Sequence, residues 1–155
     1  MKINFKKLIK VTIITFLVGG LFGFLTMGNM DIFKELNKPF ELPGIIFPIV
    51  WSILYLLMSI SYYISTEKSK TKEEKKSIRS IYIVQLIVNS LWTLIFFGFN
   101  LYFIGFLWIL LLISLVVIMI YRMFKASQLS AYLQIPYLLW LIFAGFLNFS
   151  IFLLN

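Results

Sequence analysis

Long runs of apolar residues, separated by shorter polar or charged segments, dominate this chain. Each of five runs has about the length, roughly 20 residues, that an α-helix needs to cross the hydrocarbon core of a bilayer. A spanning segment must satisfy its own backbone hydrogen bonds, which favours helices that pack side by side. The pattern predicts an all-α integral membrane protein, a five-transmembrane-helix bundle, with helices at about 8–27, 44–65, 78–99, 101–124 and 131–154.

The composition supports a membrane protein with one domain. Apolar residues make up 61% of the chain, against roughly 45–50% in soluble domains. The length of 155 residues predicts a single domain, 1–155. The first apolar run follows a basic amino end, as in a signal peptide, but it lacks an A-x-A-like cleavage site and is longer than the core of such a peptide. We therefore expect it to be a retained helix.

Positive charges are distributed unevenly over the predicted connections. Of the 14 Lys and Arg residues, twelve fall at the amino end, between the second and third helices, and between the fourth and fifth. The opposite side has Lys34 and Lys38. Because positively charged loops tend to stay in the cytoplasm, we expect a multi-pass protein whose amino end is cytoplasmic. The absence of a transit peptide and the many Lys and Ile residues favour a bacterial plasma (inner) membrane.

Several functional classes are disfavoured by the residue inventory. The chain has neither cysteine nor histidine, so we expect no metal site, no cysteine nucleophile and no tightly bound cofactor. The net charge of +8 follows from topology, without the basic, aromatic-rich stripe of a nucleic-acid surface. We therefore expect no nucleic-acid partner. We also expect no enzymatic activity, because every carboxylate falls in a predicted loop: Asp31, Glu35, Glu41, Glu67, Glu73 and Glu74.

The predicted loop at 28–43 is longer than a turn between two helices requires. Loops of this length are often lids or binding loops. Its apolar residues suit a segment that caps one end of the bundle: Met30, Ile32, Phe33, Leu36, Phe40 and Leu42.

The third predicted helix carries a polar stripe. Gln85, Asn89 and Trp92 are spaced i, i+4 and i+7, so they share one helix face. An unpaired amide in hydrocarbon is unfavourable by several kcal/mol, and this face must therefore meet protein, water or a ligand. Hydrogen bonding between helices and a ligand site both remain open.

The fifth predicted helix carries a second stripe, in which Pro136, Trp140, Ala144 and Asn148 are spaced four residues apart. Proline is expected to bend the early part of this helix. A ring, a small residue and an amide on one face suit a flat ligand, and they equally suit a close helix interface.

Two further features have alternative interpretations. Trp51 and Tyr55 lie on one face of the second helix, either as residues at the headgroup level or as part of a site. Gly19 and Gly23 form a G-x-x-x-G pattern on the first helix. This spacing permits close helix approach, within the bundle or between two copies, and we favour packing within the bundle.

Four stretches together resemble the translocator protein or tryptophan-rich sensory protein family (TspO/MBR), also known as the peripheral-type benzodiazepine receptor family. Their order and spacing match the family over nearly the whole chain. The stretches are LNKPF (36–40), PGIIFPIVWSILY (43–55), YIVQLIVNSLWTLIFF (82–97) and PYLLWLIFAGFLNFSIFLLN (136–155).

The resemblance implies a five-helix bundle, often a homodimer, with a pocket that opens toward the first loop. It implies binding of porphyrins, haem-type tetrapyrroles or similar planar hydrophobic molecules. The matching ligand-binding residues are Trp51, Gln85, Asn89, Trp92, Trp140, Ala144 and Asn148.

Some positions depart from the family pattern. Ile32 and Phe33 stand where the family usually has a Trp-Tyr pair, which disfavours light-dependent porphyrin breakdown. We therefore expect a membrane receptor or binding protein, with Lys34 and Lys38 near ligand carboxylates. A transporter of such ligands and a porphyrin-modifying protein are the alternatives.

Overall fold

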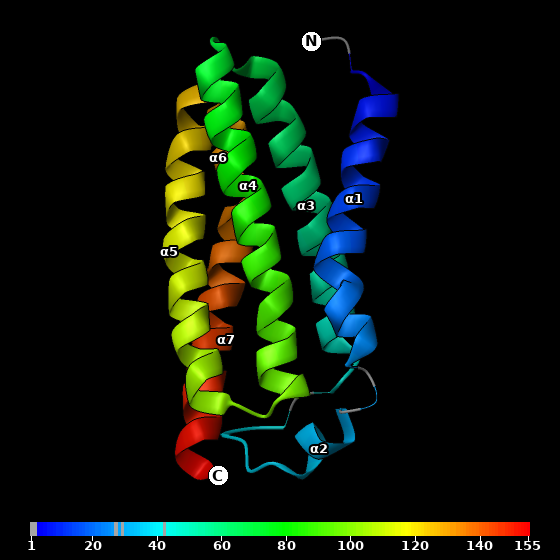
Figure 1. The fold of residues 1–155 in the computed structure, drawn as a ribbon, viewed down its shortest axis with the longest axis vertical. Helices are drawn as coiled ribbons and strands as arrows, with labels where there is room; N and C mark the ends of the chain where they lie inside the picture. Colours follow the sequence, from blue (N-terminus) through cyan, green and yellow to red (C-terminus); the bar gives the residue numbers. More distant parts are fainter. Residues whose placement is uncertain (1–2, 27, 29, 42) are drawn as a thin grey trace.

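The computed structural model describes residues 3–26, 28, 30–41 and 43–155. It confirms the predicted fold class: the described chain is helical, and five of its helices are long and apolar enough to cross a membrane. They run side by side as a bundle (Figure 1). In chain order the helices are α1 (Phe5–Leu25), α2 (Met30–Glu35), α3 (Ile46–Lys68), α4 (Lys72–Thr93), the π-helical turn η2 (Leu94–Gly98), α5 (Tyr102–Ala126), α6 (Gln128–Tyr132) and α7 (Ile135–Leu154).

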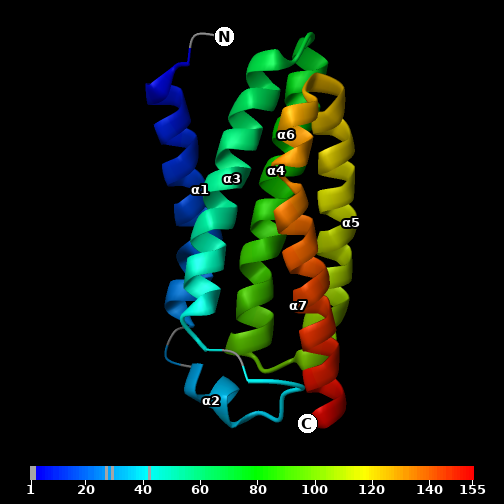
Figure 2. The same cartoon turned by 180° about the vertical axis from the view of Figure 1, so that it is seen from behind.

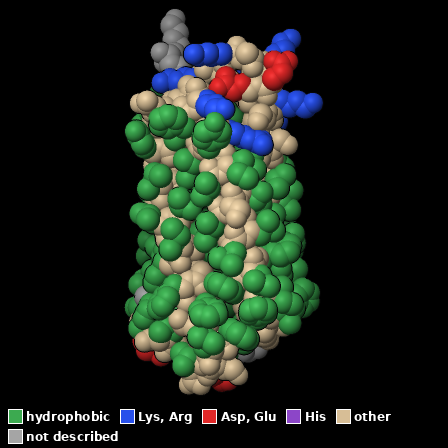
Figure 3. All heavy atoms as spheres, turned by 90° about the vertical axis from the view of Figure 1, so that its left-hand side faces the viewer, with side chains coloured by type: hydrophobic (Ala, Val, Ile, Leu, Met, Phe, Trp, Pro, Cys, Tyr) green, Lys and Arg blue, Asp and Glu red, His purple; other side chains and the backbone are tan. Residues whose placement is uncertain are grey.

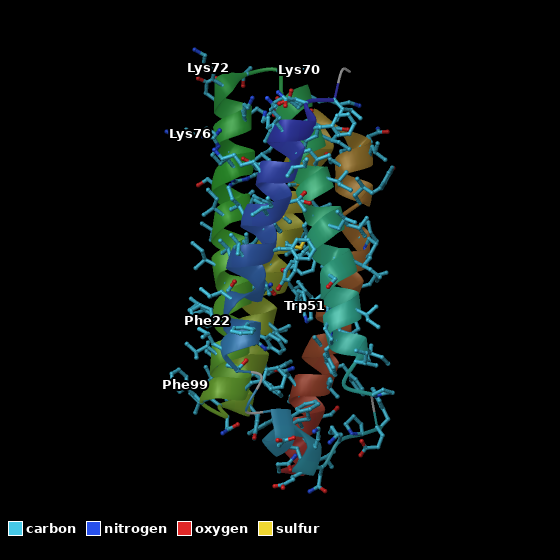
Figure 4. All side chains as sticks on the ribbon, turned by 90° about the vertical axis from the view of Figure 1, so that its right-hand side faces the viewer. Phe22, Trp51, Lys70, Lys72, Lys76 and Phe99 are labelled. Atoms are coloured by element: carbon cyan, nitrogen blue, oxygen red, sulfur yellow. The ribbon has the colours of Figure 1, made fainter. Side chains whose placement is uncertain are left out.

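The surface of the bundle has the character of a membrane-spanning protein. Hydrophobic side chains cover most of the face shown in Figure 3, and Lys and Arg side chains gather at one end. Lys70, Lys72 and Lys76 lie at that end (Figure 4). We call it the amino-terminal end and the opposite one the α2 end, since α2 lies across it (Figure 1). The five apolar helices define a multi-pass integral membrane protein.

Polar residues define where the helices begin at the amino-terminal end. The Thr71 side chain accepts a hydrogen bond from the Glu74 backbone N–H (3.0 Å), which caps α4. Glu73 and Glu74 lie in the first turn of α4, where the helix dipole favours negative charge. Glu67 lies in the last turns of α3 and pairs with Lys7 of α1. These three carboxylates, predicted in loops, therefore belong to helix ends.

The fifth predicted helix, 131–154, is interrupted just before Pro136. Helix α6 ends at Tyr132 and α7 begins at Ile135, and the bend expected at Pro136 stays a prediction. Pro136 occupies the first turn of α7, where its missing N–H would have no helical partner in any case. The stripe of Trp140, Ala144 and Asn148 consequently stands on a separate, regular helix.

A π-helical turn alters the end of α4. The Phe99 N–H donates to the Leu94 carbonyl (3.0 Å), five residues back. A π-helical turn holds more residues than an α-turn, and such turns frequently occur at functional sites. As a result Phe96 and Phe97, neighbours in sequence, are both buried at the α2 end.

The interior divides into two parts along the bundle. The core nearer the amino-terminal end combines aliphatic, methionine and tyrosine side chains, among them Met58, Met119 and Tyr137. The core at the α2 end is rich in aromatic rings, including Trp92, Phe96 and Phe97. This aromatic half positions the candidate site.

The first glycine of the G-x-x-x-G pattern packs inside the bundle. A Cβ on Gly19 would lie 2.5 Å from the Tyr55 ring, whereas a Cβ on Gly23 would meet nothing within 4 Å. The Tyr55 hydroxyl donates to the Gly19 carbonyl (2.7 Å). Gly19 thus lets α1 approach α3, and Tyr55 is a buried interior residue rather than one at the headgroup level.

Candidate ligand-binding site

A partly enclosed aromatic cavity lies in the α2 half of the bundle. Side chains of α2, α3, α4, η2 and α7 surround it. One of them is Trp51, which Figure 4 shows part of the way along α3. The lining residues are Phe33, Phe47, Trp51, Trp92, Phe96, Phe97, Trp140, Phe143, Ala144, Leu147 and Asn148.

The cavity is narrow in this conformation. The empty space at the site, which includes space open to the outside, is about 340 Å³, but the volume open to the centre of a water molecule is only about 10 Å³. The latter is about the minimum that holds one water molecule. Ligand pockets are usually about 300–1,000 Å³. The rings must therefore move apart before a planar ligand fits.

Five of the seven predicted site residues meet at this cavity. Trp51 reaches it from α3, Trp92 from α4, and Trp140, Ala144 and Asn148 from α7. The structure thus brings together side chains that are up to about a hundred residues apart in sequence. Three of them are tryptophans, each on a different helix.

Gln85 and Asn89 do not line the cavity. Both are buried on α4, further from the α2 end. The Tyr137 hydroxyl donates to Gln85 Oε1 (3.0 Å), and Asn89 Nδ2 donates to the Tyr55 hydroxyl (3.3 Å). These bonds join α4 to α7 and to α3. In this conformation both amides act as interhelical contacts, one of the two alternatives that the sequence left open.

Each of the two amides retains one atom without a hydrogen bond. Gln85 Nε2 and Asn89 Oδ1 are buried and have no partner among the described residues. An unsatisfied buried polar atom is unfavourable by about 1–3 kcal/mol. The two tyrosines determine which amide atom stays unpaired. Tyr137 bonds to the oxygen of Gln85 and leaves its nitrogen unpaired, whereas Tyr55 bonds to the nitrogen of Asn89 and leaves its oxygen unpaired.

Two polar side chains at the cavity wall are bonded to each other. Trp92 Nε1 donates to Asn148 Oδ1 (3.2 Å), and Asn148 Nδ2 donates to the Ala144 carbonyl (2.8 Å). The remaining lining side chains are aromatic or aliphatic. The cavity therefore offers ring faces and hydrocarbon surface, and the side-chain hydrogen-bonding groups of Trp92 and Asn148 are already engaged.

Aromatic rings contact one another around the cavity. Trp92 stacks on Phe96, with ring centroids 5.5 Å apart. The centroid of the Trp140 ring lies 5.3 Å from that of Phe143 and 6.1 Å from that of Phe47. Offset or edge-on pairs at such separations each contribute about 0.5–1.5 kcal/mol beyond the burial of area. A flat aromatic ligand would exchange these ring contacts for similar ones.

The segment predicted as a long loop contains α2 and closes one end of the cavity. Phe33 of α2 is buried and meets Phe97 and Phe47 edge-on, at centroid separations of 5.4 and 5.9 Å. The predicted capping role is thus visible for Phe33. Leu42 lies outside the described residues, as do the side chains of Met30 and Ile32.

The two lysines of this segment are engaged within it. Lys38 Nζ donates to the backbone carbonyls of Phe33, Lys34 and Leu36, each at 3.0 Å, and so satisfies the carboxyl end of α2. Lys34 Nζ donates to Asp31 Oδ1 (2.6 Å), which lowers the pKa of that carboxyl group. Neither ammonium group is directed at the cavity.

Sequence reasoning missed six lining residues, four of which follow from helical spacing. Phe47 precedes Trp51 by four positions, and Phe96 follows Trp92 by four. Phe143 and Leu147 each lie three positions after a predicted site residue. Phe97 faces the cavity only because of the π-helical turn, and Phe33 only because α2 folds over the bundle.

These features define a class: a five-span helical membrane protein with an aromatic cavity between its helices and a short helix across one end. The chain belongs to the TspO/MBR family, whose model matches residues 11–154. It is 32% identical to the tryptophan-rich protein TspO of Archaeoglobus fulgidus, covering 98% of this chain and 99% of that protein.

Two bacterial relatives show the same similarity over most of their length. Protein CrtK of Rhodobacter capsulatus is 36% identical to this chain, and the alignment covers 79% of this chain and 78% of CrtK. The tryptophan-rich sensory protein of Cereibacter sphaeroides is 31% identical, covering 79% and 76%. The family resemblance noted from the four sequence stretches is thereby confirmed.

Proposed function

We propose that this protein is a membrane receptor or binding protein for porphyrins or similar planar hydrophobic molecules. The observation that carries the proposal is the convergence of Trp51, Trp92 and Trp140 on one cavity. Each comes from a different helix, and the cavity presents ring faces with few free polar atoms. A ligand with an extended flat ring system matches that chemistry best.

Binding requires the cavity to widen. Phe33, Phe47 and Phe143 are lining rings without hydrogen-bonding groups. Rings can swing between rotamers at low energy when no hydrogen bond holds them. We propose that these rings move outward while the bonded pair of Trp92 and Asn148 stays in place.

A binding role fits the cavity better than a catalytic one. None of the described residues that line the cavity has an ionisable side chain, so they place no general acid or base beside a ligand. The name of the Cereibacter sphaeroides relative, tryptophan-rich sensory protein, supports a sensory role. Transport of the ligand remains the alternative, and a flux measurement across vesicles distinguishes it.

Orientation and assembly are also part of the proposal. We propose that the amino-terminal end, where Lys and Arg gather, faces the cytoplasm of a bacterial cell, because positive loops remain inside. The single cysteine of a Lys70→Cys variant should then react only with membrane-permeant reagents in intact cells. The homodimer implied by the family resemblance stays a prediction, which native mass spectrometry would check.

Titration of the purified protein with protoporphyrin tests the binding role. We expect saturable quenching of tryptophan emission, and a Kd raised roughly fivefold in Trp140→Ala, as loss of a ring contact of about 1 kcal/mol implies. Trp108→Phe is the matched control, because Trp108 lies outside the cavity and donates to the Val88 carbonyl (2.8 Å). Absence of saturable binding, or equal effects of the two substitutions, would refute the proposal.

A further inference from the structure

The cavity has two boundaries through which a ligand can pass. One is the segment 30–41, which includes α2 and covers the end of the bundle. The other is the seam between α3 and α7, which faces the surrounding bilayer. We propose that the ligand enters sideways from the bilayer, through the seam between α3 and α7, and not beneath α2. This inference rests on the proposed binding function.

The exposed part of the cavity wall lies at the seam. The lining residues of α2, α4 and η2, namely Phe33, Trp92, Phe96 and Phe97, are all buried. The lining rings that keep accessible surface belong to α3 and α7: Phe47, Trp51, Trp140 and Phe143. Because both helices are apolar spans, the accessible surface at the seam faces acyl chains.

Helices α3 and α7 are loosely joined at this level. Helix α7 packs extensively against α5 and only sparsely against α3. In Figure 2, α3 and α7 are close near the amino-terminal end and lie further apart toward α2. Among the described residues, no hydrogen bond or ion pair links α3 to α7. A seam of this kind opens without loss of a polar contact.

In the described part of the chain, aromatic rings meet across the seam. Phe47 of α3 meets Trp140 of α7, and Trp140 meets Phe143 of α7. Phe40 stacks on Phe143 with centroids 6.0 Å apart. Rotation of Phe143 and Phe47 replaces ring–ring contact with ring–lipid contact, so the rings stay in apolar surroundings and no hydrogen bond is broken.

The α2 side is fastened by polar contacts. The Asn37 N–H donates to Asn155 Oδ1, and Asn155 Nδ2 donates to the Asn37 carbonyl, both at 3.0 Å. Asn37 Nδ2 also donates to the Leu154 carbonyl (3.3 Å). These three bonds tie the segment after α2 to the end of α7. Lifting this segment breaks all three bonds and withdraws the buried Phe33 ring.

The chemistry of the ligand favours the same route. A planar hydrophobic molecule partitions from water into the bilayer, where its concentration is far higher than in solution. Passage through the seam keeps the molecule in an apolar environment throughout. Passage beneath α2 would expose it to water and to the polar groups of Asn37 and Asn155.

Two double-cysteine variants separate the routes, because the chain has no cysteine of its own. In Asn37→Cys/Asn155→Cys, a disulfide holds the segment after α2 to α7. In Phe47→Cys/Phe143→Cys, a short bismaleimide joins α3 to α7 across the seam. Each protein, in vesicles loaded with protoporphyrin, is compared with its own unlinked form, so that the substitutions themselves cancel. The measured quantity is the association rate, followed by tryptophan quenching.

We expect the disulfide to leave the association rate within about twofold of that of its unlinked form. The bridge across the seam should lower the association rate about tenfold or more, because it blocks the gate. A disulfide that stops association, or a bridged seam that leaves the rate unchanged, would overturn the inference while the binding function stands. Failure of the unsubstituted protein to bind protoporphyrin at all would overturn both.

Discussion

Trp92 and Asn148 connect the two stripes that the sequence displays separately. Trp92 Nε1 on α4 donates to Asn148 Oδ1 on α7, over 3.2 Å, and both residues are buried beside the cavity. One bond thereby joins two walls of the site. The pairing explains how polar residues are retained inside an apolar bundle.

Replacement of Asn148 by leucine should destabilise the bundle. It leaves the Trp92 N–H without an acceptor, and we expect a loss of about 1–2 kcal/mol in the free energy of unfolding, the range for interhelical hydrogen bonds. Unfolding in mixed detergent micelles measures it. Ser114→Ala is the control, because Ser114 is exposed and bonds only to its own helix. A loss no larger than that of the control would contradict this account.

Gly19 and Gly23 should respond differently to alanine. In Gly19→Ala the new Cβ would stand 2.5 Å from the Tyr55 ring, so α1 must shift or the Tyr55 hydrogen bond must lengthen. Overpacking of this kind lowers stability by about 1–3 kcal/mol. Gly23→Ala meets open space and should be neutral or slightly stabilising, because alanine favours helix. Thermal unfolding of the two variants side by side measures the difference, and equal effects would show that α1 packs otherwise.

Gln85 and Tyr137 should behave as a structural pair rather than as ligand contacts. Tyr137→Phe and Gln85→Leu each leave one buried partner unpaired, and the double variant removes both. We expect a coupling energy of about 0.6–2 kcal/mol in a double-mutant cycle of unfolding free energies.

The same variants should bind protoporphyrin with little change in Kd, since neither residue lines the cavity. A large loss of affinity in Gln85→Leu with normal stability would return Gln85 to the binding site.

Truncation of Phe33 should destabilise the ligand-free protein and strengthen ligand binding. Phe33→Ala removes the ring that α2 places in the cavity against Phe47 and Phe97. We expect a lower melting temperature for the ligand-free protein and a lower Kd for protoporphyrin, because the ligand no longer has to displace the ring. Leu36→Ala, on the same segment but outside the cavity lining, is the control. Weaker binding in Phe33→Ala would identify Phe33 as a ligand contact.

Some of the site was predictable because helices repeat at regular spacing. Residues at i, i+3, i+4 and i+7 share a face whatever surrounds them, so the stripes of Trp92 and of Trp140, Ala144 and Asn148 followed from position alone. The same rule, applied further, would have added Phe47, Phe96 and Phe143.

Other parts depend on contacts between distant residues. Whether Gln85 and Asn89 face a ligand or other helices is decided by Tyr137 and Tyr55, which stand on other helices. The interruption between α6 and α7 likewise lies where the sequence predicted one continuous helix.

The sequence by itself determined that this is a five-span helical membrane protein, because hydropathy and helix length must match the bilayer for each segment separately. It also identified which residues share a helix face. Only the tertiary structure decided which faces meet, that Phe33 folds back over them and that Phe97 turns inward. Those outcomes depend on packing between helices and on the π-helical turn, neither of which has a period that can be recognised along one chain.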